Sequence, residues 1–133
     1  AAKGMYENVD FTSSLLTGAA WDRTLGWLEE TGAVSSLEIV GDSKSWGNYS
    51  DDNFSETGGL INTGSKLETE KNHIFDLAGN VEEWTTEADS FDNRVDRGGG
   101  SGYIGSDFPV SFRLNRNPDD AYRAFGFRLA LFL

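Results

Sequence analysis

The sequence has no cysteine and only one histidine among its 133 residues. Without cysteine the chain forms no disulfide, carries no thiol nucleophile and offers no sulfur ligand to a metal. It also lacks an apolar run of the roughly 20 residues that a membrane-spanning helix needs, so we expect no insertion into a membrane. Proline is scarce at two residues whereas glycine reaches sixteen, which predicts many tight turns. The length fits a single domain over residues 1–133.

Basic residues are half as numerous as acidic ones. There are 11 Lys and Arg against 22 Asp and Glu, which gives a formal net charge of −11. We therefore expect no nucleic-acid partner, because binding to phosphates needs a basic surface. The charge is uneven, since residues 1–93 carry −13 and residues 94–133 carry +2. Solubility is the simplest role for the acidic part.

One amphipathic helix is predicted in "LLTGAAWDRTLGWLEETG". Thr17 is a suitable N-cap, and Trp21, Leu25 and Leu28 recur at helical spacing. Gly32 is a typical signal for the end of a helix. We therefore expect these three apolar residues to be buried in the core.

The segments on either side of this helix are shorter or more polar. The first fourteen residues suggest the tail of a helix followed by a polar connection, and residues 34–40 have mild β character. Residues 41–71 form a long stretch rich in Gly, Ser, Asn and Asp. A loop of that length is usually functional, ion-bound or disordered, but Trp46 within it indicates packing.

Short strands are predicted in the second half of the chain. Residues 74–77 and 81–85 flank an "AGN" turn, and "RVDRGGGSG" suggests a strand that runs into a bend. The terminal "FGFRLALFL" alternates, so Phe127, Leu129 and Leu131 are expected to face the core together with Trp84. The predicted fold is α+β, with one main helix, a small twisted antiparallel sheet and long loops.

Three pieces of the sequence together resemble one family. They are "LLTGAAWDRTLGWL", "NHIFDLAGNVEEW" and "RVDRGGGS…SFR…GFRLAL", and their order and spacing are similar to motifs of the formylglycine-generating enzyme (sulfatase-modifying factor) family. The resemblance covers residue 12 to the end. It implies a C-type-lectin-like fold that lacks the family's N-terminal strands. The terminal strand would then lack its usual partner, or another chain would supply it, and self-association is a further expectation.

The same resemblance implies a structural calcium ion. Its ligands would be the side chains of Asp76 and Glu83 and the backbone carbonyls near Gly79 and Val81. Calcium prefers six to eight oxygen ligands, which short glycine-containing turns can supply. Glu82 stands where the family usually has tryptophan. The alternative is that Asp76 only closes the turn, Trp84 is core and the glutamates are solvated.

Catalysis is not expected. Oxidising members of the family use a pair of cysteines, which this chain lacks, and iron-dependent relatives use several histidines, whereas this chain has only His73. A pair of carboxylates for glycoside cleavage is conceivable, but nothing in the sequence singles out two of them. We interpret the chain as a non-enzyme.

Residues 98–128 have the composition of a recognition surface. Aromatic and aliphatic residues are mixed with Asp, Asn, Ser and Arg without a regular period, which is typical of adaptable binding surfaces. After Gly98 the chain contains no Lys, Glu, Gln, Trp or Met. These five residue types are the ones that codons ending in a pyrimidine cannot encode.

This pattern resembles the variable region of proteins diversified by retroelements. Such proteins are displayed on phage tails or bacterial surfaces, so the resemblance implies an extracellular receptor-recognition domain whose partner is a protein or glycan on a cell surface. The alternatives are a fixed binding or structural module of the same fold, with Phe112, Phe125 and Phe127 buried. The predicted ligand-binding residues are Tyr103, Ile104, Asp107, Phe108, Val110, Phe112, Leu114, Asn115, Asn117, Asp119, Asp120 and Tyr122, with Phe125 as a further variable candidate.

Overall fold

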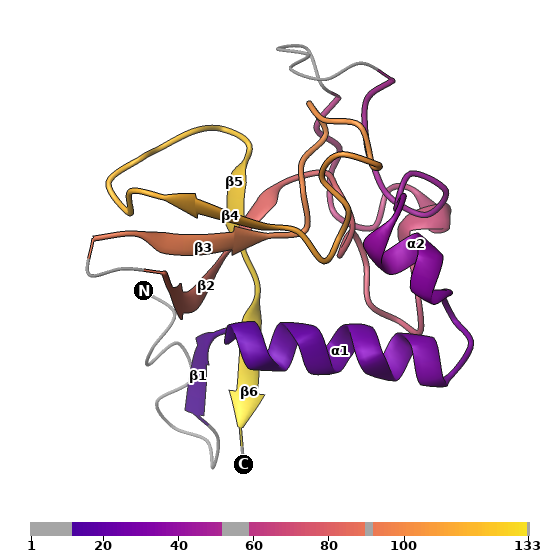
Figure 1. The fold of residues 1–133 in the computed structure, drawn as a ribbon, viewed down its shortest axis with the longest axis horizontal. Coiled ribbons are helices and arrows are strands. Elements are labelled where there is room, and N and C mark those ends of the chain that lie inside the picture. Colours follow the sequence, from indigo (N-terminus) through magenta and orange to yellow (C-terminus); the bar gives the residue numbers. More distant parts are fainter. Residues whose placement is uncertain (1–11, 52–58, 90–91, 133) are drawn as a thin grey trace.

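The computed structural model describes residues 12–51, 59–89 and 92–132. It has the predicted α+β architecture, with one long helix, small sheets and long loops (Figure 1). No helix in these ranges is long and apolar enough to cross a membrane. The elements are β1 (Thr12–Leu15), α1 (Gly18–Glu30), α2 (Ser36–Val40), the 3₁₀ helix η1 (Leu67–Thr69), β2 (Glu82–Ala88), β3 (Arg94–Arg97), β4 (Arg113–Arg116), β5 (Phe125–Phe127) and β6 (Leu129–Phe132).

Helix α1 forms as its sequence predicts. The Thr17 side chain caps the helix by accepting a hydrogen bond from the Ala20 backbone N–H at 3.0 Å. After the C-cap, Gly32 takes the left-handed conformation that a glycine adopts without a steric cost, with φ of +72°. The predicted apolar stripe of Trp21, Leu25 and Leu28 is buried.

The prediction of β structure over residues 34–40 is wrong, because residues 36–40 form α2. Ser35 and Glu38 make a capping box: the Ser35 hydroxyl accepts from the Glu38 N–H, and the Ser35 N–H donates to the Glu38 carboxylate. These reciprocal bonds satisfy donors at the helix start, and they outweigh the β preference of Ile39 and Val40.

The larger sheet has the strand order β4-β3-β2-β5. The first three strands form the expected antiparallel meander, and β5 adds a parallel strand beside β2 after a long connection. The predicted bend after β3 is present, since Gly98 and Gly99 both have positive φ. Residues 74–77, predicted as a strand, form only one isolated bridge between Lys71 and Ile74.

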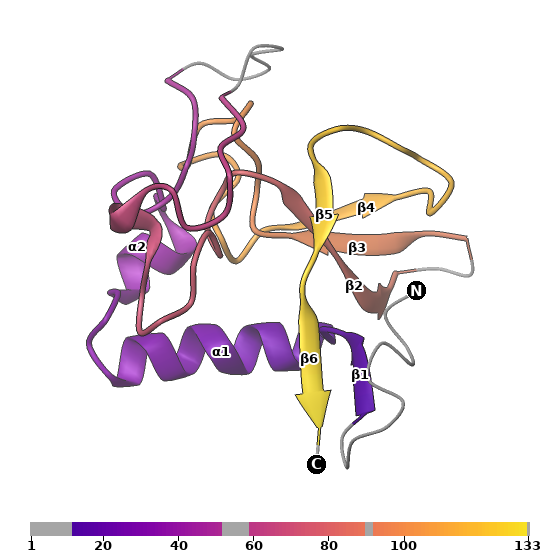
Figure 2. The same cartoon turned by 180° about the vertical axis from the view of Figure 1, so that it is seen from behind.

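A second, two-stranded sheet joins the two ends of the described chain. β1 pairs antiparallel with β6, from Thr12 opposite Phe132 to Leu15 opposite Leu129. It lies beside the start of α1 (Figure 2). The expectation that the terminal strand lacks a partner within the chain is therefore wrong, because β1 supplies it. Residues 1–11, predicted in part as a helix tail, lie outside the described residues.

The core lies between α1, α2 and the loops rather than on the terminal strand. Its largest fully buried apolar members are Trp21, Leu28, Trp46, Leu77 and Val110, so the predicted packing of Trp46 is confirmed.

Four other predicted core residues lie outside the core cluster. Trp84 and Leu129 are only half-buried, and Phe127 and Leu131 are 52% and 57% exposed. The alternation of the terminal segment is interrupted at Arg128, where β5 ends and β6 begins, so the two halves join different sheets.

An ion-pair network fixes α1 to one face of the larger sheet, here called the inner face. Arg97 of β3 has a fully buried side chain that donates to Asp22 of α1 and to Glu87 of β2. Arg113 of β4 donates to the same two carboxylates. The Arg97 guanidinium also lies 5.7 Å from the centre of the Trp21 ring. The opposite, outer face of the sheet therefore points away from α1.

Candidate ligand-binding face

The outer face is defined by strand alternation and register. Trp84 pairs with Asp96, and Asp96 pairs with Leu114, so these three side chains share one face. Arg116 is two residues beyond Leu114, and Phe125 pairs with Glu82, two residues before Trp84. Side chains from four strands, distant in sequence, are thereby brought together.

Arg116 is the central residue of the outer face. Its Nε donates to Asp96 Oδ2 at 2.8 Å, and its Nη2 donates to both oxygens of Glu82 at 2.9 and 2.8 Å. The same Nη2 lies 3.3 Å from the Tyr103 hydroxyl, and the guanidinium lies 4.8 Å from the centre of the Phe125 ring. One cation thus holds two carboxylates and two aromatic rings in fixed positions.

The two carboxylates beneath Arg116 are in an unfavourable environment for negative charge. Glu82 and Asp96 are 3% and 2% exposed. Burial raises the pKa of Glu82. Burial, and next the charge of Glu82, raises the pKa of Asp96 to about 7, against the attraction of Arg116. The two acids are coupled, and near neutral pH the cluster therefore exchanges a proton.

A continuous row of aromatic rings extends on both sides of Arg116. On one side Tyr103, Phe108 and Phe112 follow one another with ring centres 4.2 and 4.9 Å apart. On the other side Phe125 lies 5.6 Å from Tyr122, edge to face. Tyr122 is 71% exposed and the other four rings are half-buried. We call these five residues with Arg116 the aromatic row.

All but one of the predicted ligand-binding residues are exposed or half-buried. Asp107, Asn115, Asn117, Asp119, Asp120 and Tyr122 are exposed, and Tyr103, Ile104, Phe108, Phe112 and Leu114 are half-buried.

Val110 is a wrong assignment, because it is fully buried in the core. Its carbonyl accepts from Trp21 Nε1 at 3.1 Å and its N–H donates to the Ser43 hydroxyl at 2.9 Å. Asn115 alternates with Arg116 along β4 and so faces the inner side.

Sequence reasoning missed the residues that organise this face. Arg116 lies inside the predicted segment but was not among its candidate residues, and Asp96 was not considered. Glu82 drew attention as a glutamate in place of a tryptophan, yet the alternative interpretation had it solvated, and it is buried. The signal in the sequence for this cluster was that two acids, Glu82 and Asp96, lie on predicted strands. An acid that a sheet buries requires a cationic partner such as Arg116.

The residues predicted to hold calcium lie close to Arg128, whose guanidinium is itself a cation. Arg128 Nη2 donates to Glu83 Oε1 at 2.6 Å, and Arg128 Nε donates to Glu83 Oε2. The same Nη2 lies 3.3 Å from the carbonyl oxygens of Phe75 and Asp76. Burial raises the pKa of Glu83, against these bonds from Arg128.

The other predicted ligands are engaged in the turn itself. The Asp76 carboxylate accepts from the Thr69 hydroxyl at 2.6 Å and from the Gly64 N–H at 2.8 Å. Gly79 has φ of +72°, and a Cβ there would lie 2.4 Å from the Asn48 carbonyl oxygen. Val81, half-buried, directly precedes β2.

This arrangement does not fit a calcium ion, because both carboxylates are already bound to internal donors. Within the described part of the chain, no three His, Cys, Asp or Glu side chains converge as a metal site would require. Calcium binding at these residues stays a prediction, and it would require Arg128 to leave Glu83.

Comparisons with known proteins agree with this fold. A family model described as "Sulfatase-modifying factor enzyme 1-like domain" matches residues 16–132. The solved structure of CarF has a TM-score of 0.67 at 22% identity and aligns with 90% of this chain and 46% of its own. Treponema denticola variable protein 1 has a TM-score of 0.61 at 24% identity, over 89% of this chain and 47% of its own.

The likeness to these two structures shows the fold, which is C-type-lectin-like as the resemblance implied. The chain spans about half the length of each of them. A search of curated proteins finds no match.

Proposed function

The chain belongs to the sulfatase-modifying factor enzyme 1-like domain family, and we propose that within this family it serves recognition rather than catalysis. In this proposal the outer face and the loops around it bind a protein or glycan on a cell surface. The domain itself would be displayed outside the cell, on a virion such as a phage tail or on a bacterial surface.

The aromatic row is the observation that carries this proposal. Rigid rings supply large contact areas at a small entropic cost, and they often dominate binding energy. Here they are held from below, because Arg116 anchors Tyr103 and Phe125 to two buried carboxylates. The exposed Asp and Asn residues beside the row supply adaptable polar contacts.

Diversification of this face by a retroelement is the finer part of the proposal. It is supported by the residue types missing after Gly98 and by the fold shared with a variable protein. The structure divides the segment in a way that suits this role. Val110 is core and Arg113 ties β4 to α1, whereas Asp119, Asp120 and Tyr122 are exposed and lie outside the core.

A direct test is to measure binding of the fluorescently labelled chain to a panel of bacterial and animal cells. Tyr122→Ala removes the most exposed ring of the row and is expected to weaken binding to any cell that the parent chain recognises. Leu67→Ala is the matched control, since Leu67 is 78% exposed in η1, away from β5 (Figure 1). Equal binding by both variants, with unchanged melting temperatures, would show that the row is not the binding surface.

A fixed binding module of the same fold would give the same outcome with these variants but would not vary between copies of the gene. An enzyme would instead require particular carboxylates or His73 for turnover. The His73 side chain is 98% exposed, with its Nδ1 3.5 Å from Glu70 Oε1, so it is not enclosed as the histidine of an active site usually is.

A further inference from the structure

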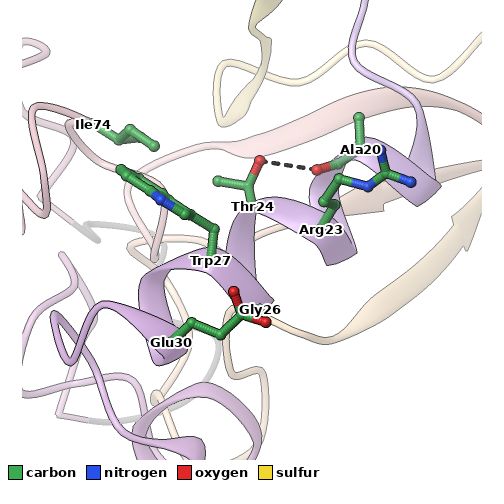
Figure 3. Close-up of a pocket in the computed structure, with 7 residues that line it drawn as sticks. All are labelled: Ala20, Arg23, Thr24, Gly26, Trp27, Glu30 and Ile74. Carbon is green, nitrogen blue, oxygen red and sulfur yellow. Dashed lines mark hydrogen bonds between the residues drawn. The ribbon is translucent and has the colours of Figure 1, made fainter.

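An open apolar groove of about 630 Å³ lies along α1 (Figure 3). It is notable for Trp27, which is 43% exposed beside Ile74 instead of being buried like Trp21. Gly26 contributes no side chain, and a Cβ there would meet no atom within 4 Å. The groove is lined by Ala20, Arg23, Thr24, Gly26, Trp27, Glu30 and Ile74.

The groove carries one charge of each sign. Arg23 and Glu30 are seven residues apart, so they lie on the same face of the helix, about 10 Å apart along its axis. Both are exposed, and neither forms an ion pair with any residue that the structure describes. Trp27 lies near the midpoint between them.

We propose that this groove is the contact between two copies of the chain, whose α1 helices pack antiparallel about a two-fold axis near residues 26 and 27. Such an axis places Arg23 of each copy opposite Glu30 of the second copy. Trp27 then meets Trp27 of the second copy between the two ion pairs, and Gly26 allows the helix backbones to approach.

The pattern of charge argues for a second copy over an unrelated partner. A two-fold interface must be complementary to itself, and a cation and an anion placed symmetrically about one point satisfy that condition. One helix face is smaller than the roughly 800 Å² per partner of a standard interface, so the dimer is expected to be weak and dependent on concentration.

The arrangement is compatible with ligand binding, because α1 contacts the inner face of the sheet and the aromatic row lies on the outer face. Both copies would therefore keep the aromatic row accessible, and two binding surfaces in one particle increase avidity for a multivalent target. The dimer does not depend on the proposed recognition role, since it uses different residues.

The test is the oligomeric state of the full chain and of charge variants, measured by sedimentation equilibrium. The parent chain should show a monomer–dimer equilibrium. Arg23→Glu and Glu30→Arg each turn two attractive pairs into two repulsive ones, and each should weaken dimerisation by about tenfold or more. The double variant R23E/E30R should recover it.

Mixing the two single variants provides the decisive arm. An antiparallel contact places two glutamates of one chain opposite two arginines of the other, so the mixture should form a heterodimer that native mass spectrometry detects. A parent chain that stays monomeric at every concentration would overturn the proposal. It would also be overturned if the variants dimerise like the parent, or if their mixture shows no preference for the heterodimer. Circular dichroism of each variant excludes loss of the helix as the cause.

Discussion

Replacing Asp96 by asparagine should make the stability of the domain less dependent on pH. Asp96 is 2% exposed, and its pKa rises from 3.8 in the unfolded chain to about 7 in the fold, mainly through burial. A raised carboxyl pKa means that the folded state binds the proton more tightly. The protonated Asp96 carboxyl therefore contributes fully to stability below about pH 4, and this contribution is lost as the pH rises through 7.

The magnitude follows from the shift of about three pKa units. At about 1.36 kcal/mol per unit, the ionisation of Asp96 costs on the order of 4 kcal/mol above pH 7 and nothing below pH 4. At pH 5 roughly a third of this cost is already present. The Asp96→Asn variant keeps an oxygen that can accept from Arg116 Nε but has no charge to bury. Between pH 5 and pH 8, the free energy of unfolding of this variant should rise by roughly 2–3 kcal/mol relative to that of the parent.

Urea unfolding at a series of pH values measures this difference directly, because the linear extrapolation gives the free energy of unfolding at each pH. Asp119→Asn is the control for loss of one acidic group at an exposed position. If the stabilities of the parent and Asp96→Asn change in parallel from pH 5 to pH 8, Arg116 keeps Asp96 ionised in the fold. The account of the outer face as a proton-exchanging cluster would then be wrong.

Three further predictions concern stability. Arg128→Gln leaves the Glu83 carboxylate buried without its cation, so it should lower the free energy of urea unfolding by about 3 kcal/mol. A chelator should leave the melting temperature of the parent chain unchanged, and a drop in that temperature would show that calcium does bind. Trp21→Ala should destabilise the fold by about 3–5 kcal/mol and half-buried Trp84→Ala by clearly less, so equal losses would contradict the core described here. Ser35→Ala should cost about 1 kcal/mol by removing the capping box of α2, and an unchanged midpoint of urea unfolding would show that the capping box does not stabilise the fold.

The sequence predicts the helix and the composition of the binding face because both depend on local pattern. Thr17, the spacing of Trp21, Leu25 and Leu28, and Gly32 together determine α1. Local chemistry would also have identified α2, since Ser35 and Glu38 have the spacing of a capping box. The weight given to the β-branched residues after them led to the wrong element.

The organisation of the site depends on strand register, which the sequence does not reveal. Arg116 meets Glu82 and Asp96 only because β4, β3 and β2 pair in one specific alignment, and a slip by one residue would place each side chain on the other face. The exposure of Phe127 follows similarly from the interruption at Arg128, whose guanidinium turns toward Glu83. Val110 was assigned to the surface because it lies in a segment that mixes apolar and polar residues without a regular period, but its partners Trp21 and Ser43 are distant in sequence.

The most direct test of the central claim is to sequence many copies of this gene from its source population over the codons for residues 98–133. If the outer face is a diversified recognition surface, differences should concentrate at the exposed positions Asp107, Asn117, Asp119, Asp120 and Tyr122 and at the half-buried rings of the row. Val110, Arg113 and Arg128 should stay fixed, since each holds the scaffold together. A segment that is invariant, or that varies no more at exposed positions than at these three, would contradict the account.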